Sequence, residues 1–437
     1  MKILKYTEAS FQKEFEAVLA TSSLFDLEIE ERVRTIIQKV QIEGDDGLLS
    51  LVENIDGIKL TPQQLRVAME EEIAASLKTI SNKEMDQAFK KALKNISFFA
   101  KKSLRKNWKS TNSHGAQVGE KFDPFERVGV YVPAGKAPLA STALMTIPLA
   151  KEAGCKEIIV CTPCGKDGSI RPELLYAAKL AGATEIYRIG GAQAIAAMAF
   201  GTKTIQKVQK IFGPGNSYVV AAKRLLFGHV AVDLLPGPSE VLVIADKTAN
   251  PCFIAADILA QAEHGSGKER VWLITTSEKL LNQVQGQIAE QLEQAVRKEL
   301  LIPVLEKGTA LILVKDIKQG LILANRLAPE HCEVMTADPE KTAEGIHTAG
   351  ALLLGKYTPA VLGDYVAGPS HVLPTGGAGV SFPGLTVDQF QRRTSIVKYS
   401  KESLLKAYPA VRCFSEMEGL IAHGKSAEIR LQGSAQS

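Results

Sequence analysis

Four short segments place histidine near carboxylate or amide side chains, in contexts rich in glycine and proline. Gln261 and His264 lie three residues apart in QAEHG, at the end of an alanine-rich stretch with helical spacing, so both side chains point to one face. An oxygen and a nitrogen donor at this spacing can supply half of a zinc site. Glu330 and His331 are adjacent in APEH, where an acid and a base can serve one reaction.

The other two segments are GDYVAGPSHVLPT, with Asp364 and His371, and EGLIAH, with Glu418 and His423, in the last helical stretch. Each segment also has an ordinary structural interpretation. The Gln-x-x-His pair can cap a helix, Glu330 can favour a helix start, Asp364 can occupy a turn, and the other side chains can be solvated. No segment by itself therefore establishes a site.

The common nucleotide-binding motifs are missing from the sequence. No G-x-G-x-x-G follows any strand-like run, and HGSGKE departs from a P-loop because Glu269 stands where serine or threonine is required. ATP binding of that type is therefore excluded. Two loops, GGAQA (190–194) and GPGN (213–216), still offer backbone N–H groups and a helix start to a phosphate, so they are candidate phosphate sites.

The six cysteines are too sparse for a disulfide scaffold. Cys161 and Cys164 have C-x-x-C spacing after an apparent strand. A redox or zinc role would require a helix starting at the first cysteine, or a second such pair. Pro163 and Gly165 indicate a turn instead, and the sequence has no second pair, so it disfavours both roles.

Two kinds of pattern divide the chain. Up to about residue 110, charged stretches with apolar residues at helical spacing predict a mainly helical region. From Phe125, short β-branched runs alternate with alanine-rich stretches, which is typical of α/β units with parallel sheets. LLPGPSE (234–240) predicts a hinge between two such units. The predicted regions are 1–110, 111–237, 238–376 and a C-terminal tail at 377–437.

The composition is that of an ordinary globular protein. Of 437 residues, 45% are hydrophobic and 23% charged, which suffices for several cores and excludes disorder as the dominant state. An evenly spread net charge of +4 does not favour nucleic acid or a membrane surface as partner. No apolar run approaches the roughly 18 residues of a membrane span, and charges interrupt the N-terminus, unlike a secretory signal. We expect a cytoplasmic protein.

Taken together, the motifs resemble the histidinol dehydrogenase family. The four histidine segments occur in the family's order, and four further motifs resemble it as well: GVYVPAG (129–135), GGAQAIAA (190–197), FGPGNSYV (212–219) and LPGPSEVLVIAD (235–246). The resemblance runs from about residue 125 to about residue 425. The sequence departs from the family pattern at Ala134, where glycine is more usual, and at Cys164, where proline is expected.

The resemblance implies an activity, two cofactors and an assembly. Members oxidise L-histidinol through the aldehyde to L-histidine and reduce two NAD⁺, with one zinc ion per active site, and they are homodimers with shared active sites. It also implies two Rossmann-like but incomplete units: the first (111–237) binds NAD⁺ without the glycine fingerprint, and the second (238–376) holds the zinc and catalytic residues. L-Histidinol is then the small-molecule partner, and neither nucleic acid nor a membrane is expected.

Residue by residue, the resemblance assigns roles to the matching positions. The implied zinc ligands are Gln261, His264, Asp364 and His423. The implied substrate-binding residues are Ser239, Gln261, His264, His331, Asp364, His371, Glu418 and His423. The residues implied to hold the nicotinamide cofactor are Tyr131, Gln193 and Asn216. In the family the terminal glutamate and histidine complete the neighbouring subunit's pocket, so Glu418 and His423 are expected to do the same.

Glu330 and His331 fit the chemistry of such an oxidation as catalytic residues. Each oxidation removes a proton from oxygen and a hydride from carbon, and the neutral imidazole of His331 can take the proton. The second oxidation needs water to add to the aldehyde, and the Glu330 carboxylate can activate that water. Zinc would orient the substrate nitrogens rather than carry out hydride chemistry.

Three alternatives stay open on sequence alone. Cys332 can form a hemithioacetal with the aldehyde, although its place at a strand start predicts that it points into the core. A relative with the same fold can oxidise another amino alcohol or a sulfonated diol, which the presence of Glu418, His371 and His423 disfavours. A non-catalytic metal- or nucleotide-binding regulator would lack the acid–base pair.

Overall fold

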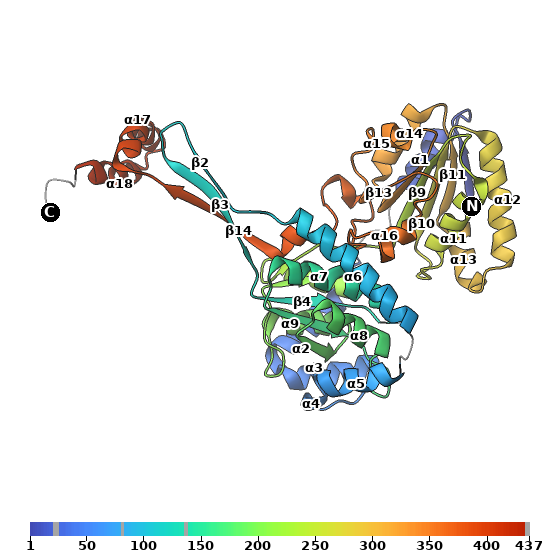
Figure 1. Ribbon diagram of the computed structural model, residues 1–437, viewed down its shortest axis with the longest axis horizontal. Coiled ribbons are helices and arrows are strands. Elements are labelled where there is room, and N and C mark those ends of the chain that lie inside the picture. The colour runs from blue at the N-terminus through green and yellow to red at the C-terminus, as the bar shows by residue number, and fades with distance from the viewer. Residues whose placement is uncertain (21–25, 80–82, 135–138, 433–437) are drawn as a thin grey trace.

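The computed structural model of the protein describes residues 1–20, 26–79, 83–134 and 139–432. Figure 1 shows two α/β bodies and a long arm that carries the C-terminal helices. The predicted fold class is confirmed: two successive parallel-sheet units, a helical N-terminal segment and a small helical C-terminal tail.

The first unit is built on a five-stranded parallel sheet in the order β6-β5-β4-β7-β8. Its strands are β4 (Arg127–Tyr131), β5 (Glu157–Thr162), β6 (Glu185–Arg188), β7 (Lys210–Phe212) and β8 (Ala231–Val232). The connecting helices are α7 (Ala140–Ala153), α8 (Pro172–Ala181), α9 (Gly191–Phe200) and α10 (Ser217–Leu226). Every residue of β4 is buried, as expected for a central parallel strand covered on both faces.

The second unit contains a six-stranded parallel sheet in the order β1-β11-β10-β9-β12-β13. Its strands are β1 (Lys2–Lys5), β9 (Glu240–Ala245), β10 (Arg270–Thr275), β11 (Thr309–Leu313), β12 (His331–Met335) and β13 (Ala351–Leu354). Its helices are α1 (Phe11–Leu19), α11 (Pro251–Ala262), α12 (Glu278–Glu293), α13 (Lys298–Lys307), α14 (Ile317–Leu327), α15 (Pro339–Ala343) and α16 (Ala360–Tyr365).

Two apolar clusters cover the opposite faces of this second sheet. Cys332 and Val334 of β12 belong to the cluster that packs against α1 and α14. Met335 belongs to the cluster that packs against α11, α12 and α13. Because successive side chains of a strand alternate between faces, His331 and Glu333 lie on the same face as Met335, towards α11.

The N-terminal residues pack on both α/β units. β1 pairs with β11 along its whole length, and α1 packs on the second unit. The helices that follow cover the first unit: α2 (Leu27–Glu43), α3 (Asp45–Leu51), the π-helix η1 (Val52–Asp56), α4 (Pro62–Leu65), α5 (Met69–Thr79) and α6 (Lys83–Ser103). The first hundred residues are therefore mostly helical, but they form no separate body.

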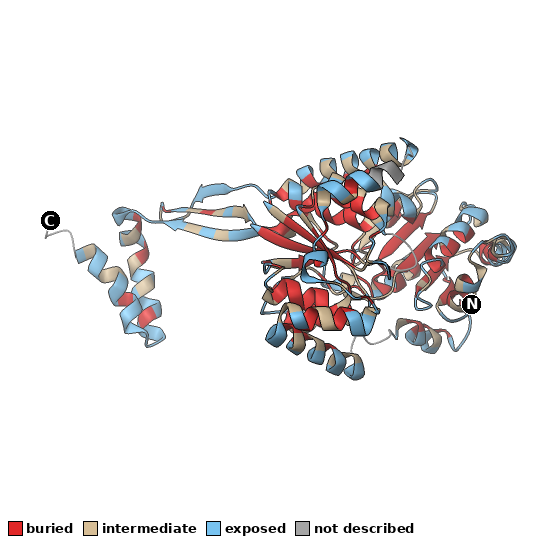
Figure 2. Cartoon of the chain, turned by 90° about the horizontal axis from the view of Figure 1, so that it is seen from below, coloured by how far each residue is buried: buried red, intermediate tan, exposed pale blue. Residues whose placement is uncertain are grey.

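A three-stranded antiparallel sheet forms the arm. Its strands, in the order β14-β3-β2, are β2 (Trp108–Thr111), β3 (Gln117–Pro124) and β14 (Gln391–Lys398). Helices α17 (Lys401–Met417) and α18 (Ile421–Gln432) pack on each other at its far end, away from both α/β units (Figure 1). Most of the arm is exposed or half-buried (Figure 2).

The two helices of the arm expose many large apolar side chains. They are Leu405, Phe414, Met417, Leu420, Ile421 and Ile429. The body exposes a second set near α16, namely Tyr357, Val361, Leu362 and Tyr365. Contiguous exposed apolar side chains of this kind mark surfaces that bind another molecule.

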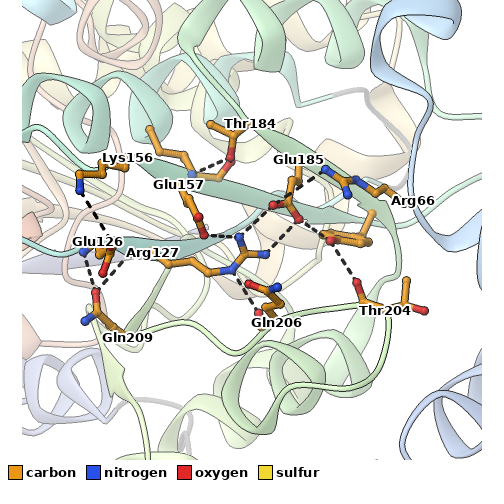
Figure 3. A network of polar contacts seen from close by, with 12 residues as sticks. Arg66, Glu126, Arg127, Lys156, Glu157, Thr184, Glu185, Thr204, Gln206 and Gln209 are labelled. Atoms are coloured by element: carbon orange, nitrogen blue, oxygen red, sulfur yellow. Dashed lines mark hydrogen bonds and ion pairs between the residues drawn. The ribbon is translucent and has the colours of Figure 1, made fainter.

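A buried arginine ties together the amino ends of three strands of the first sheet. The Arg127 guanidinium donates to Glu157 Oε2 at 2.5 Å and to Glu185 Oε1 and Oε2 at 2.9 and 3.0 Å (Figure 3). It also donates to the carbonyl oxygen of Gln206. Burial opposes the charge of Arg127, but the two carboxylates outweigh that effect and raise its pKa.

Replacing Arg127 by leucine is expected to lower the free energy of unfolding by roughly 3–5 kcal/mol, because two carboxylates lose their buried partner. Urea denaturation measures the loss. The double variant Arg127→Leu/Glu185→Leu is the control, and it is expected to recover part of the stability because one unpaired carboxylate is removed. A wild-type urea midpoint in the single variant would contradict a stabilising role for the network.

Candidate active site

The candidate residues lie at two sheet edges. Tyr131 ends β4, and Gln193 and Asn216 follow β6 and β7, so all three belong to the carboxyl edge of the first sheet. That edge is where open parallel sheets bind their ligands. His331 instead begins β12, at the amino edge of the second sheet. Contacts between the two units include His371 Nε2, which lies 3.3 Å from Thr142 Oγ1 of α7, and Asn95 Nδ2 of α6, which donates to the carbonyl oxygen of Val366 at 2.8 Å.

Five side chains form a polar cluster, with His331 at its centre and Glu330, Asp364, His264 and His371 around it. Its side chain is buried, Nε2 lies 3.1 Å from Asp364 Oδ1, and Nδ1 lies 3.3 Å from the carbonyl oxygen of Glu240. Burial alone would lower the pKa of His331, but the charges of Glu330 and Asp364 raise it to about 9. In this state the ring is an imidazolium whose two N–H groups donate to Asp364 and to the Glu240 carbonyl.

Glu330 lies beside His331 and is also buried. Its Oε2 accepts the backbone N–H of Glu240 at 2.8 Å and lies 3.8 Å from His331 Nδ1, and the Ser239 side chain hydrogen bonds to the same carboxyl group. Burial raises the pKa of Glu330 to about 7, against the opposing charge of His331. A carboxyl group in this range can give or take a proton near neutral pH.

The turn before Glu330 has an unusual backbone conformation. Ala328 has φ +45°, and it is the one non-glycine residue with positive φ in the described part of the chain. It ends α14 and turns the chain through Pro329 into β12. Left-handed conformations of residues with a side chain are costly and cluster at functional sites. This turn sets the direction in which the side chains of Glu330 and His331 project from the backbone.

Asp364 and two further histidines complete the cluster. Burial opposes ionisation of Asp364, but the hydrogen bond and charge of His331, with the charges of His371 and His264, keep its pKa below the usual value. His371 Nδ1 lies 3.1 Å from the backbone carbonyl oxygen of Asp364. The Asp364 carboxylate is therefore ionised beside three histidine side chains.

Two of the predicted zinc ligands, Gln261 and His264, differ in exposure. Gln261 is buried at the end of α11, and its Nε2 has no hydrogen-bond partner in the described structure. His264 follows the helix end and is exposed. Partial desolvation lowers the pKa of His264, although the charge of Asp364 opposes this shift, and a neutral imidazole is the form that ligates a metal. The buried amide of Gln261 lacks a partner that a ligand can supply.

Glu418 and His423 do not join this cluster within one chain. They lie at the end of α17 and in α18, at the far end of the arm (Figure 1), and both are exposed. Accordingly, the described residues of one chain contain no group of three or more histidine, cysteine, aspartate or glutamate side chains that could hold a metal ion. The four-residue set of Gln261, His264, Asp364 and His423 is therefore not assembled by a single chain.

The predicted cofactor residues contact neighbouring loops. The Tyr131 hydroxyl accepts the backbone N–H of Gly191 at 3.0 Å, and burial raises the pKa of Tyr131 to about 12. Gln193 Nε2 donates to Asp56 Oδ2 at 3.2 Å, so η1 of the N-terminal segment reaches this edge. Asn216 is exposed, and its Oδ1 caps α10 by accepting two backbone N–H groups.

Close approach of the backbone explains one glycine of the GPGN loop. Gly213 has φ +108°, and a Cβ there would lie 2.1 Å from the carbonyl oxygen of Tyr131. The loop therefore lies directly against the end of β4. At the other loop, Gly190 precedes α9 and offers no side-chain cap, which leaves N–H groups of the first helical turn available to an anion.

The cysteines give no support to thiol chemistry. Cys161 is fully buried, and burial raises its pKa to about 12, so the C-x-x-C pair lacks a reactive thiolate. Cys332 is fully buried on the face of β12 opposite to His331, and burial raises its pKa as well. Cys164 and Ala134, where the sequence departs from the family pattern, are partly buried and pack against the apolar core of the first α/β unit.

Sequence reasoning missed several polar residues: Asp56, which contacts Gln193 at the edge of the first sheet, and Thr142, Asp257 and Glu333 near the cluster. Glu333 and Asp257 are carboxylates within predicted apolar elements, and a buried charge in such a run is a signal that sequence alone offers. Thr142 gives no such signal, because threonine is common in helices and strands alike.

The fold is α/β, with a buried cluster of Glu330, His331 and Asp364 at the amino edge of its second parallel sheet. The family model for histidinol dehydrogenase matches residues 20–431. A histidinol dehydrogenase of Rhodopseudomonas palustris is 44% identical over 96% of this chain and 97% of its own length. One of Geobacillus kaustophilus is 42% identical over 92% of this chain and 93% of its own length.

A solved structure agrees with these sequence relatives. The crystal structure of a histidinol dehydrogenase from Elizabethkingia anophelis covers 99% of this chain and 98% of its own, with 36% identity and a TM-score of 0.94. The chain therefore belongs to the histidinol dehydrogenase family, and it is an oxidoreductase. In the described residues, no helix has the length and apolar character that crossing a membrane requires.

Proposed function

We propose that the protein oxidises L-histidinol to L-histidine in two steps, with NAD⁺ as electron acceptor and a zinc ion in the site, as the last step of histidine biosynthesis in the cytoplasm. The observation that carries this proposal is the buried group of Glu330, His331 and Asp364. It supplies an acid–base pair beside an ionised carboxylate, and membership of the family supplies the substrate.

The donors present fit a zinc ion. Gln261 has a buried amide without a partner, Asp364 is ionised, and His264 favours its neutral form, so these three side chains would hold the metal together with His423 of a second chain. Nitrogen and oxygen donors of this type suit zinc. When bound, the ion supplies a positive charge that fixes the substrate's amino and imidazole nitrogens and so aims the carbinol carbon.

The carboxyl edge of the first sheet fits NAD⁺. The uncapped start of α9 offers N–H groups to the pyrophosphate, and Tyr131, Gln193 and Asn216 border this edge. When bound there, NAD⁺ would supply the hydride acceptor for each oxidation. The contact between Thr142 and His371 joins this edge to the histidine cluster, which supports transfer between the two units.

His331 would accept the hydroxyl proton of the alcohol at Nε2. Its Nδ1–H is held by the Glu240 carbonyl, so the second nitrogen is the one that can be free. Nε2 faces Asp364, whose negative charge raises the pKa of His331. A cation held by Asp364 would share that charge and lower the pKa of the imidazole, and Nε2 of His331 would then be free to act as a base.

Glu330 would act in the second oxidation, which consumes water. Its carboxylate takes a proton from the water whose oxygen adds to the aldehyde carbon, and it returns that proton to the aldehyde oxygen. The product is the gem-diol whose C–H hydride can leave. Ser239 and the N–H of Glu240 hold the carboxylate in place. Its pKa of about 7 makes it an effective base at neutral pH.

Replacing Glu330 by glutamine is expected to slow oxidation of the aldehyde by about 100-fold or more and oxidation of the alcohol much less. Supplying histidinol and histidinaldehyde separately and following NADH measures both rates. Glu240→Gln, which removes the neighbouring buried carboxyl, is the control and should leave the ratio of the two rates unchanged. Equal losses in both steps would argue against water activation by Glu330.

The exposed arm supports a homodimer with shared active sites. In one chain the apolar side of α17 and α18 and the apolar side chains near α16 are both uncovered. A two-fold dimer buries one set against the other and brings His423 and Glu418 to the second chain's cluster. The active site would then be complete only in the assembly.

The decisive experiment follows NADH formation from L-histidinol before and after removal of metal by a chelator. Two NADH per histidinol consumed, loss of activity on chelation and recovery with zinc are expected. One NADH per substrate would contradict the two-step oxidation. Full activity without metal would remove zinc from the proposal, and no turnover of histidinol by the metal-loaded protein would overturn the proposed substrate.

A further inference from the structure

A carboxyl group outside the acid–base pair connects two elements of the site. Glu333 lies on β12, two residues after His331 and on the same face, and it is 1% exposed. Its Oε1 accepts the backbone N–H of Ala360 at 2.7 Å. Ala360 is the first residue of α16, and the residue before it, Pro359, offers no side-chain cap. Glu333 therefore satisfies an N–H at the start of the helix that carries Asp364.

The Glu333 carboxyl group also lies beside another carboxyl group. In the described structure, Glu333 Oε2 is buried and has no N–H or hydroxyl group as hydrogen-bond partner. A hydrogen bond joins the carboxyl groups of Asp257 and Glu333. Two carboxyl groups can make that bond only if they share a proton. Burial raises the pKa of both side chains, which keeps the proton in place.

Asp257 connects a third element to this contact. It lies on α11, one helical turn before Gln261, so both side chains occupy the same side of the helix. The chain from Asp257 through Glu333 to Ala360 thus joins α11, β12 and α16. These three elements carry or precede Gln261, His264, His331 and Asp364.

We propose that Asp257 and Glu333 form a positioning clamp that sets the distance between the metal-binding and proton-transfer side chains of the site. Neither residue touches substrate or cofactor. The hydrogen-bonded carboxyl pair holds α11 and α16 against the strand of His331, and its loss lets Gln261 and Asp364 move apart. This inference rests on the proposed function for the roles of those side chains, whereas the clamp itself is tested by its effect on α16.

The test compares two replacements of Glu333. Glu333→Gln keeps an oxygen for the Ala360 N–H and an NH₂ group for the Asp257 carboxylate, so it preserves both contacts. Glu333→Leu removes both. Met335→Ala is the matched control, because Met335 lies on the same face of the same strand and is equally buried but makes no polar contact with α16. It reports general loss of packing.

Three experiments are made on each full-length variant: zinc affinity by competition with a chelator, steady-state kinetics giving kcat and KM for histidinol, and amide hydrogen exchange in residues 360–365. Glu333→Leu is expected to lose about 10- to 100-fold in zinc affinity and in kcat, the range seen for residues that support metal ligands. Exchange in α16 is expected to accelerate. Glu333→Gln and Met335→Ala are expected to keep zinc affinity, kcat and protection of α16.

The outcomes separate the clamp from the proposed function. Faster exchange and weaker zinc binding in Glu333→Leu alone support the clamp even if the wild type does not oxidise histidinol. Unchanged exchange and zinc affinity in Glu333→Leu, or an equal effect in Met335→Ala, would overturn it. If Glu333→Leu does not fold, Asp257→Ala tests the same contact at a half-buried position, and wild-type zinc affinity in that variant likewise overturns the clamp.

Discussion

Replacing His331 by asparagine is expected to lower kcat for both oxidations by about 10²- to 10⁴-fold, the usual contribution of a positioned general base. The imidazole Nε2 is the proposed proton acceptor, and the asparagine side chain has no basic nitrogen. Zinc should remain bound, because His331 is not among the proposed ligands. Stopped-flow measurement of NADH with each substrate, together with the metal content, checks the result.

The control for this variant is His347→Asn. His347 is exposed on the second unit, and its backbone N–H, not its side chain, donates to Asn325 Oδ1. It should therefore retain wild-type rates. If the His331→Asn variant oxidised its substrates at the wild-type rate, His331 would not be the base. Its 3.1 Å contact with Asp364 would then have only a structural role.

A mixture of two inactive chains is expected to regain activity if the active sites are shared. A His423→Ala chain has an intact body, and a His331→Asn chain has an intact arm. In their heterodimer one site combines the intact body with the intact arm. Random mixing gives half heterodimers with one working site each, so about a quarter of wild-type activity is expected.

Heterodimers isolated with two different affinity tags sharpen this measurement, because each should have about half the activity of the wild-type dimer. Both parent homodimers are measured alongside them and should stay inactive. Absence of recovery in confirmed heterodimers would place His423 in the site of its own chain. The distance of α18 from the His331 cluster within one chain (Figure 1) makes recovery the expected result.

The parts of the fold that the sequence predicted are those with local patterns. The alternation that begins at Phe125 predicted both parallel sheets, because each strand is a short apolar run next to its own helix. β1 and β14 were not predicted. Their sequences, KILK and QRRTSIVK, carry lysine and arginine, and they become strands only by pairing with residues far away in the chain. Local propensity cannot reveal such pairings.

The same limit applies to the site. Glu330 and His331 are neighbours, and Gln261 lies three residues before His264, so spacing alone indicated chemistry there. The contact of His331 with Asp364 spans 33 positions, and the contact of His371 with Thr142 spans 229. Only the resemblance to a family linked Asp364 to the site in advance. Glu333 and Asp257 went unnoticed because each looks like an isolated acid in an apolar element.

The pairing of β3 with β14 has a consequence for how the protein is made. β3 is synthesised early, and its partner strand lies more than 260 positions later. β1 likewise cannot pair until β11 has been synthesised. On the ribosome, the nascent chain can build most of the first sheet while one edge of β3 has no neighbour. The arm closes only after nearly the whole polypeptide has emerged, so we expect a slow, late folding phase in which exposed strand edges need protection from aggregation.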